Sequence, residues 1–351
     1  MNTFDFTVNH AVTSQRRYEG ARLLSIDVER SVVQHLMVGD LPDHFRAGDI
    51  LVVNDAATLP SSLSGYHKRS EQAIELRLAM PLTSDRKDIS RWRAVLFGEG
   101  NWRIPTEKRH LPPEVLAGDF LDFAGGLKAK IISVHQDISR RFIDVEFVER
   151  GSNLWRKFYR VARPIQYSYL KEDLALWDQQ TLFAGPPLAL EPPSASFVLT
   201  WDILFQLDSL GVEILSLTHA TGLSNTGDER IDRMLPLSEP YRISHNVQVR
   251  LMEACRVGKR VVAVGTGVVR ALESWAGKFC QQEWSWANLK IDERFQRRVV
   301  SGLLTGLHEP EATHLSLLRA FVSDSLLPQA YREASMLGYL WHEYGDVCLI
   351  L

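Results

Sequence analysis

Short apolar runs rich in β-branched residues, each followed by a polar turn, recur along the chain. The clearest is Val261–Val264, which is followed directly by Gly265, Thr266 and Gly267. Beyond this turn the apolar residues fall at positions 268, 269 and 272, the spacing of a helix that packs on a sheet. Residues 259–274 are therefore predicted to form a buried strand, a tight turn and the start of a helix.

The same pattern predicts alternating strands and helices at both ends of the chain. Strands are expected at 22–27, 31–37, 50–53, 212–217, 301–304 and 347–351, and helices at 196–210, 246–255 and 313–323. Ser244 is placed to cap the helix at 246–255. Residues 163–193 are rich in proline and aromatic residues, show little periodicity, and are predicted to be extended.

A middle segment has a different pattern, with alternating strands and no long helical period. The strands are expected at 73–80, 92–97, 120–123, 128–134 and 142–147. Short strands at this spacing predict a small antiparallel barrel or a sandwich. The sequence thus predicts a mixed α/β main domain with an inserted, barrel-like all-β domain, divided as 1–61, 62–157 and 158–351.

Composition narrows the class of protein. Of 351 residues, 45% are hydrophobic and 24% charged, as in ordinary globular proteins. Neither a signal peptide nor an apolar run of membrane-spanning length is visible, so we expect a cytoplasmic protein without a membrane partner. The cysteines, Cys255, Cys280 and Cys348, are far apart and lack ligand spacing, which predicts neither a disulfide framework nor a metal site.

The net charge of −3 gives the chain no overall basic footprint for nucleic acid. One local patch, 156–160, interleaves cations with aromatic residues as a phosphate-binding surface would. A solvated amphipathic helix explains this patch equally well. The sequence leaves the oligomeric state open and is compatible with a monomer.

Polar side chains follow four of the predicted strands. If these strands are neighbours in one sheet, their ends converge on one cleft with two imidazoles, carboxylates and a guanidinium, a set suited to proton transfer around a charged small molecule. Each residue also has a structural explanation, as a core histidine or ordinary turn chemistry. The residues are Asn54 and Asp55, His219 and Thr221, Thr266 and Arg270, and His308 and Glu311.

The Gly265–Gly267 turn predicts a small anion site, because the first N–H groups of the following helix lie free at the edge of the sheet. Arg270 is expected in the first helical turn, where a cation is unfavourable relative to the helix dipole. Its presence indicates a bound anion or a carboxylate partner. The alternative is a surface arginine on an ordinary strand–helix unit.

Several segments, in a fixed order, span nearly the whole chain and carry a family resemblance. They are GDILVVNDAATLPSSLSG (48–65), EPPSAS (191–196), GVEILSLTHATG (211–222), SEPYRI (238–243), VVAVGTGVVRALES (261–274), LLTGLHEPEATHLSLLRAF (303–321) and EYGD (343–346). In this order they resemble the S-adenosylmethionine:tRNA ribosyltransferase-isomerases of queuosine biosynthesis.

The resemblance implies an enzyme that uses S-adenosylmethionine as a co-substrate and ribosyl donor, with no metal. Such a transferase and isomerase, of the pentosyltransferase type, moves the ribosyl unit onto a 7-aminomethyl-7-deazaguanine in tRNA. It isomerises this unit to the epoxycyclopentane-diol of epoxyqueuosine and releases adenine and methionine. The implied partners are therefore tRNA, as the default acceptor, and the small-molecule donor.

The resemblance also suggests roles for individual residues. A sulfonium next to C5′ acidifies the protons of that carbon, so a base is needed there, and the departing adenine needs a proton donor. The expected catalytic residues are His219, His308, Glu311 and Asp346. The expected substrate-binding residues are Asn54, Asp55, Ser194, Thr221, Gly222, Glu239, Gly265, Thr266, Gly267, Arg270, Thr313 and Tyr344.

Departures from the family pattern indicate a divergent branch. The first motif lacks its Thr and Arg at Ala56 and Ala57, Leu237 and Gly306 replace a His and an Asn, and residues 193–199 lack a His. Two alternatives therefore stay open: the same donor with a small-molecule acceptor, or a catalytically silent RNA- or ligand-binding paralogue. A nicotinamide oxidoreductase built on the Gly-Thr-Gly turn is disfavoured, because no acidic ribose partner is evident about 20 residues on.

Overall fold

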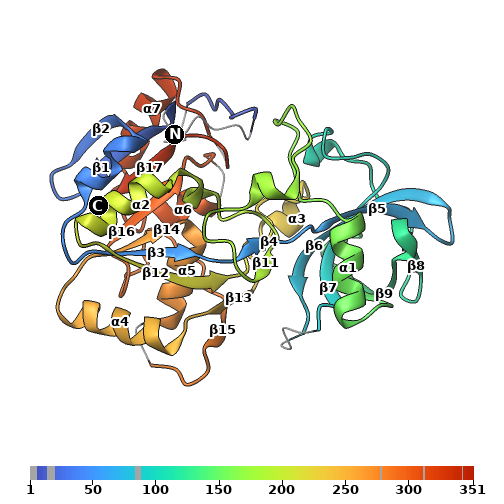
Figure 1. Cartoon of the computed structure of the whole chain (residues 1–351). Helices are drawn as coiled ribbons and strands as arrows, with labels where there is room; N and C mark the ends of the chain where they lie inside the picture. Colours follow the sequence, from blue (N-terminus) through green and yellow to red (C-terminus); the bar gives the residue numbers. More distant parts are fainter. Residues whose placement is uncertain (1–5, 14–19, 84–87, 277–278, 311–312, 342) are drawn as a thin grey trace. The chain divides into compact units, whose positions relative to one another are not determined.

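The computed structural model describes residues 6–13, 20–83, 88–276, 279–310, 313–341 and 343–351 (Figure 1). The chain forms two compact units. The sheet unit comprises Met1–Ala57, Gln180–Thr221 and Glu239–Leu351, and the barrel unit comprises Thr58–Gln179 and Gly222–Ser238.

A nine-stranded sheet organises the sheet unit. Its strand order is β15-β13-β12-β3-β14-β16-β17-β1-β2, and the central pairs β12·β3, β3·β14 and β14·β16 are all parallel. The strands are β1 (Arg22–Asp27), β2 (Val32–Met37), β3 (Ile50–Asn54), β12 (Glu213–His219), β13 (Glu239–Arg242), β14 (Val261–Val264), β15 (Trp284–Ala287), β16 (Gly302–Gly306) and β17 (Val347–Ile350).

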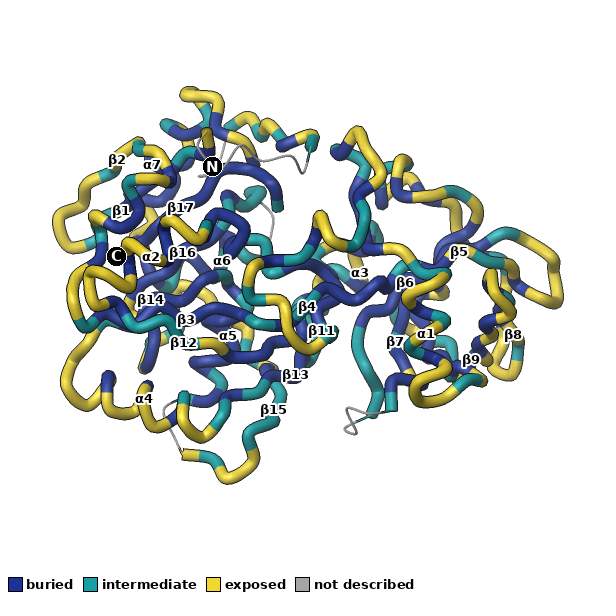
Figure 2. Tube along the Cα trace, in the orientation of Figure 1, coloured by how far each residue is buried: buried dark blue, intermediate teal, exposed yellow. Residues whose placement is uncertain are grey.

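Both faces of this sheet are covered, which explains the unbroken apolar runs in the sequence. On β3, Ile50 and Val52 face one hydrophobic core, and Leu51 and Val53 face the other. The first core includes residues of α4, α5 and α7, and the second includes residues of α2 and the 3₁₀ helix η2. Figure 2 shows β3 and β14 buried along their length, whereas α4 exposes much of its surface.

The helices of the sheet unit are mostly short. They are η2 (Val38–His44), η6 (Ser194–Val198), α2 (Trp201–Ser209), α4 (His245–Arg256), α5 (Thr266–Trp275), α6 (Thr313–Leu318) and α7 (Leu326–Met336). The predicted cap of α4 is confirmed, because Oγ of Ser244 accepts a hydrogen bond from N–H of Val247. A short strand, β11 (Pro187–Ala189), lies in the predicted extended segment, and β4 (Ala57–Thr58) lies where the chain leaves the unit.

The barrel unit is a closed antiparallel barrel, which decides between the two predicted all-β architectures. Its strand order is β10-β7-β6-β5-β8-β9. The elements are β5 (Ser62–His67), β6 (Gln72–Pro81), β7 (Arg91–Phe97), β8 (Phe120–Phe123), β9 (Lys128–Val134), β10 (Phe142–Phe147), α1 (Gly151–Val161), α3 (Glu229–Asp232), η3 (Thr106–Lys108), η4 (Ala124–Gly126) and η5 (Leu176–Gln179).

The predicted fold class is confirmed, and single elements differ from their predicted bounds. The helix expected at 196–210 is two pieces, because Oγ1 of Thr200 accepts a bond from N–H of Ile203 and starts α2 there. The helix expected at 313–323 ends at Leu318. The segments 158–179 and 222–238 pack with the barrel unit, whereas the sequence grouped them with the main domain.

Candidate functional site

The four strands that end in polar residues are immediate neighbours in the sheet. Their order is β12-β3-β14-β16, and all run parallel. Parallel strands present their carboxyl ends at one edge of the sheet, where open α/β folds bind ligands. The four strands are therefore neighbours in one sheet, which is the condition under which the sequence predicted that their ends converge.

A buried cluster of three charged or ionisable side chains lies at this edge. Glu239, the first residue of β13, receives Nη1 of Arg270 in an ion pair, and its Oε2 lies 3.1 Å from Nε2 of His219. Arg270 also donates to the carbonyls of Leu289 and Ala287, at 3.1 and 3.2 Å. His219 is 0% exposed and Glu239 and Arg270 are each 5% exposed, so solvent screens the cluster little.

Arg270 therefore has the carboxylate partner that its position predicted. It lies one turn later than expected, because α5 begins at Thr266. The partner, Glu239, precedes it by 31 residues in the chain. A buried guanidinium between a carboxylate and two carbonyls is a fixed positive charge, and it holds the Glu239 carboxylate beside His219.

The imidazole of His219 packs directly against the amino end of α5. A Cβ atom at Gly267 would lie 2.8 Å from Nδ1 of His219, closer than real Cβ contacts come, so only glycine fits there. Gly265 has a φ of +93° and no side chain caps α5, so the turn presents backbone N–H groups at this end. The site thus combines an imidazole with the positive end of a helix dipole.

Asn54 fixes the backbone on which His219 is carried. Its Nδ2 donates to the His219 carbonyl and its Oδ1 accepts from the His219 N–H, both at 2.9 Å. Nδ2 also lies 3.5 Å from Oγ1 of Thr221. The Asp55 carboxylate instead accepts bonds from the hydroxyls of Thr218 and Ser216, at 2.6 and 3.3 Å. Asn54 is thus a positioning residue, and Asp55 ties β3 to β12.

A second pair of imidazoles follows β16. The ring of His308 stacks on that of His314, with centroids 5.0 Å apart, and its Nε2 lies 2.8 Å from Oγ1 of Thr305. Burial lowers the pKa of His314, and Arg270 lowers it further while Glu239 opposes the shift. Since the charges of Glu239 and Arg270 both act on His314, the histidine pair lies near the His219–Glu239–Arg270 cluster.

Of two further predicted residues, one lies in η6, the helix that meets the α5 turn, and the other stacks on that helix. Ser194 begins η6, and a Cβ at Gly265 would lie 3.8 Å from Cβ of Ala195 in the same helix. The ring of Phe197, also in η6, stacks on the ring of Tyr344 with centroids 5.5 Å apart. Residues from the EPPSAS, GTG and EYGD segments therefore meet at this end of the sheet.

The remaining predicted residues are placed differently. Asp346 accepts hydrogen bonds from N–H and Nε of Arg22 and from N–H of Leu340, so its carboxylate anchors the start of β17. Gly222 begins a segment of the barrel unit. Glu311 lies outside the described residues, and for Thr313 the structure describes only that it begins α6.

Sequence reasoning missed Thr305 and His314 as members of the site. His314 follows His308 by six residues, a spacing without a recognised motif, and only the turn after β16 brings the two rings together. Over the described residues, no group of three or more His, Cys, Asp or Glu side chains is arranged to hold a metal ion. In the same residues, every helix is too short or too polar to cross a bilayer.

Comparisons with known proteins point in one direction. The profile of the family described as "Queuosine biosynthesis protein" matches residues 1–350. A protein of Thermus thermophilus is 30% identical over 91% of this chain and 89% of its own length. One of Symbiobacterium thermophilum is 27% identical over 100% and 99%. Both carry the name S-adenosylmethionine:tRNA ribosyltransferase-isomerase.

A solved structure shares the fold. The S-adenosylmethionine tRNA ribosyltransferase of Thermotoga maritima superposes with a TM-score of 0.53 at 21% identity, covering 99% of this chain and 100% of that one. The same arrangement of sheet and inserted barrel therefore exists in a protein of that name.

Proposed function

Because the chain belongs to the queuosine biosynthesis protein family, we propose that it is an S-adenosylmethionine-dependent ribosyltransferase-isomerase that modifies tRNA. The ribosyl moiety of S-adenosylmethionine is transferred to a 7-aminomethyl-7-deazaguanine in tRNA and isomerised, which forms epoxyqueuosine and releases adenine and methionine. With tRNA as acceptor, the reaction takes place in the cytoplasm. The relatives with this name cover almost the whole chain, which supports the assignment.

One structural observation carries the site assignment. His219, Glu239 and Arg270 come from three separate family segments and form one buried cluster at the carboxyl ends of the parallel strands. In this proposal His219 and His308 transfer protons, from the carbon next to the sulfonium and to the departing adenine. The carboxylate of Glu311 orients them or acts as base, whereas that of Asp346 is held by Arg22 and by N–H of Leu340 and supports the start of β17.

Charge complementarity suggests how the donor is held. The methionine end of S-adenosylmethionine carries a carboxylate, and the turn Gly265–Gly267 presents the positive end of α5. Arg270 contributes by holding Glu239 rather than through free donors of its own. Ser194 lies in η6, the helix that meets this turn, Tyr344 stacks on that helix, and Asn54 and Thr221 support the strand end that carries His219.

The decisive experiment follows adenine by chromatography. The purified protein is incubated with S-adenosylmethionine, alone and with tRNA that carries the 7-aminomethyl-7-deazaguanine. Adenine formed only with that tRNA supports the proposal. Adenine formed only with a free nucleobase or amine would favour the small-molecule acceptor, and donor binding without adenine release would favour the silent paralogue; no structural observation favours either.

A variant pair tests the site separately from the reaction. His308→Ala is expected to lower the rate of adenine release at least tenfold, because it removes a proton-transfer group. His245→Ala is the control, since His245 is exposed and its ring contacts the carbonyl of Gln281 and the ring of Phe279, neither of which belongs to the proposed site. Equal rates in the two variants would remove His308 from the proposed mechanism.

A further inference from the structure

The interior of the barrel unit holds three arginine side chains around one phenylalanine ring. The guanidinium carbons of Arg77, Arg109 and Arg141 lie 5.1, 4.9 and 5.0 Å from the ring centroid of Phe97. The three arginines are 1%, 2% and 5% exposed. Buried arginines are rare unless each is paired, so the charge in this cluster needs an explanation.

A single carboxylate is in direct contact with the cluster among the described residues. Glu75 lies opposite Phe97 in the β6·β7 ladder, and its Oε1 and Oε2 accept from Nε of Arg77 at 2.6 Å and Nη1 of Arg109 at 2.7 Å. The hydroxyl of Ser62 also donates to Oε1, at 3.0 Å. Among the described residues, no hydrogen bond or ion pair joins Glu75 to Arg141.

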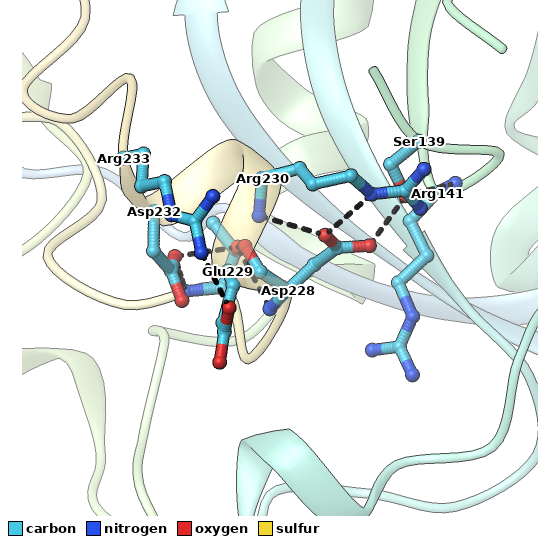
Figure 3. A network of polar contacts seen from close by, with 8 residues as sticks. Ser139, Arg141, Asp228, Glu229, Arg230, Asp232 and Arg233 are labelled. Carbon is cyan, nitrogen blue, oxygen red and sulfur yellow. Dashed lines mark hydrogen bonds and ion pairs between the residues drawn. The ribbon is translucent and has the colours of Figure 1, made fainter. Parts of the chain in front are cut away.

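A second carboxylate that influences Arg141, Asp228, has other hydrogen-bond and ion-pair partners. It accepts from Oγ of Ser139 at 2.6 Å and lies 3.5 Å from Nε of Arg230. Figure 3 shows this network, and none of its dashed lines reaches the guanidinium of Arg141. Asp228 raises the pKa of Arg141, but burial lowers it more and Arg109 adds to the lowering. Contacts among the described residues of the barrel unit therefore do not balance the positive charge of the cluster.

Each of the three guanidinium groups also has a donor without an acceptor. Nη1 of Arg77, Nε of Arg109 and Nη1 of Arg141 are buried and make no hydrogen bond within the described part of the chain. Two further donors have partners: Nη2 of Arg141 bonds to the Arg109 carbonyl at 2.6 Å, and Nη2 of Arg109 lies 3.4 Å from the Gly98 carbonyl. Native proteins rarely leave buried donors unpaired, least of all charged ones.

We propose that the barrel unit binds one small inorganic oxyanion, of the phosphate or sulfate type, through Arg77, Arg109 and Arg141. An oxyanion offers several acceptor oxygens for the planar N–H groups of guanidinium, and it neutralises the excess charge. The arginines are too deeply buried to reach a phosphate that is part of a larger molecule. This proposed oxyanion site does not depend on the His219–Glu239–Arg270 cluster or on the reaction proposed for that cluster.

The test measures anion binding by the full-length protein in two ways. Anions released on denaturing the extensively desalted protein are identified by ion chromatography, which detects a tightly held ion. Equilibrium dialysis against labelled phosphate or sulfate detects an exchangeable one. We expect one oxyanion per chain by one method or the other, and an empty result in both would overturn the proposal.

A variant pair assigns the site. Arg141→Gln is expected to weaken oxyanion binding at least tenfold and to abolish the rise in melting temperature that added phosphate causes at constant ionic strength. Arg140→Gln is the matched control, since Arg140 is the adjacent, exposed arginine, and it should behave as the parent protein does. Equal binding by both variants, or the same stabilisation by chloride as by phosphate, would show only an adventitious ion and refute the site.

Discussion

Gly267→Ala tests whether the position of the His219 ring matters for turnover. The new methyl group would lie 2.8 Å from Nδ1 and 3.0 Å from Cε1, whereas ordinary contacts begin near 3.4 Å, so the ring must retreat by about 0.6 Å. It has little room to do so, because Nε2 already lies 3.1 Å from Glu239 and Asn54 fixes the backbone.

The expected magnitudes separate activity from stability. Overpacking a rigid site costs about 1–3 kcal/mol, and the gain in helix propensity from glycine to alanine offsets up to about 1 kcal/mol of this. A displacement approaching 1 Å at a reacting group can cost up to about a hundredfold in rate. We therefore expect adenine release to fall about tenfold to a hundredfold, while the free energy of unfolding falls by no more than about 3 kcal/mol.

The assay compares this variant with Gly39→Ala. Gly39 has open space around its Cα, so the same substitution meets no atom there. Both proteins are assayed for adenine release with precursor tRNA and unfolded in urea. If Gly267→Ala matches Gly39→Ala in rate, the ring position of His219 is irrelevant to the reaction and the site assignment fails.

Three further predictions address charge and burial. Glu239→Gln leaves Arg270 buried without its carboxylate and should lower the free energy of unfolding in urea by about 3–5 kcal/mol; Glu213→Gln, which breaks the exposed pair with Arg250, should change it far less. Because burial lowers the pKa of His314 below its ordinary 6.5, protonation favours the unfolded chain. Stability should be fully present above about pH 6.5 and fall as the pH drops below it, and His314→Asn should flatten that decline whereas His110→Asn should not. Burial also raises the pKa of the Cys348 thiol, so a thiol reagent should modify exposed Cys255 in the folded protein and Cys348 only on unfolding.

The sequence predicts those parts of the fold that depend on local pattern. The apolar runs gave β1, β3 and β14 nearly to the residue, because a strand buried on both faces carries a continuous apolar signal. The convergence of four strand ends also followed, since it requires only that the strands be parallel neighbours. The cap at Ser244 is equally local, because the side chain bonds to an N–H three residues ahead.

Features that depend on distant partners could not be predicted in this way. In β6, Glu75 and Arg77 alternate with Ile74, Leu76 and Leu78, a pattern typical of one solvated face, yet all five side chains are buried. Closure of the barrel around Phe97 buries the polar face of β6. The local sequence pattern of β6 does not indicate this closure. Glu239 could not be identified locally as the partner of Arg270 either, because 31 residues separate the two in the sequence.

The charge of the His219–Glu239–Arg270 cluster has a consequence for the proton transfers proposed for His219. Arg270 and Glu239 neutralise one another, so the cluster is neutral with a neutral imidazole and carries one positive charge when His219 is protonated. A nearby sulfonium opposes protonation of His219, because like charges repel across a buried site. A carboxylate at the amino end of α5 favours it. Under the proposed function, His219 is thus suited to stay neutral, as a base must, while the sulfonium is present, and to hold a proton for adenine once cleavage of the carbon–sulfur bond has converted the sulfonium to the uncharged thioether of methionine.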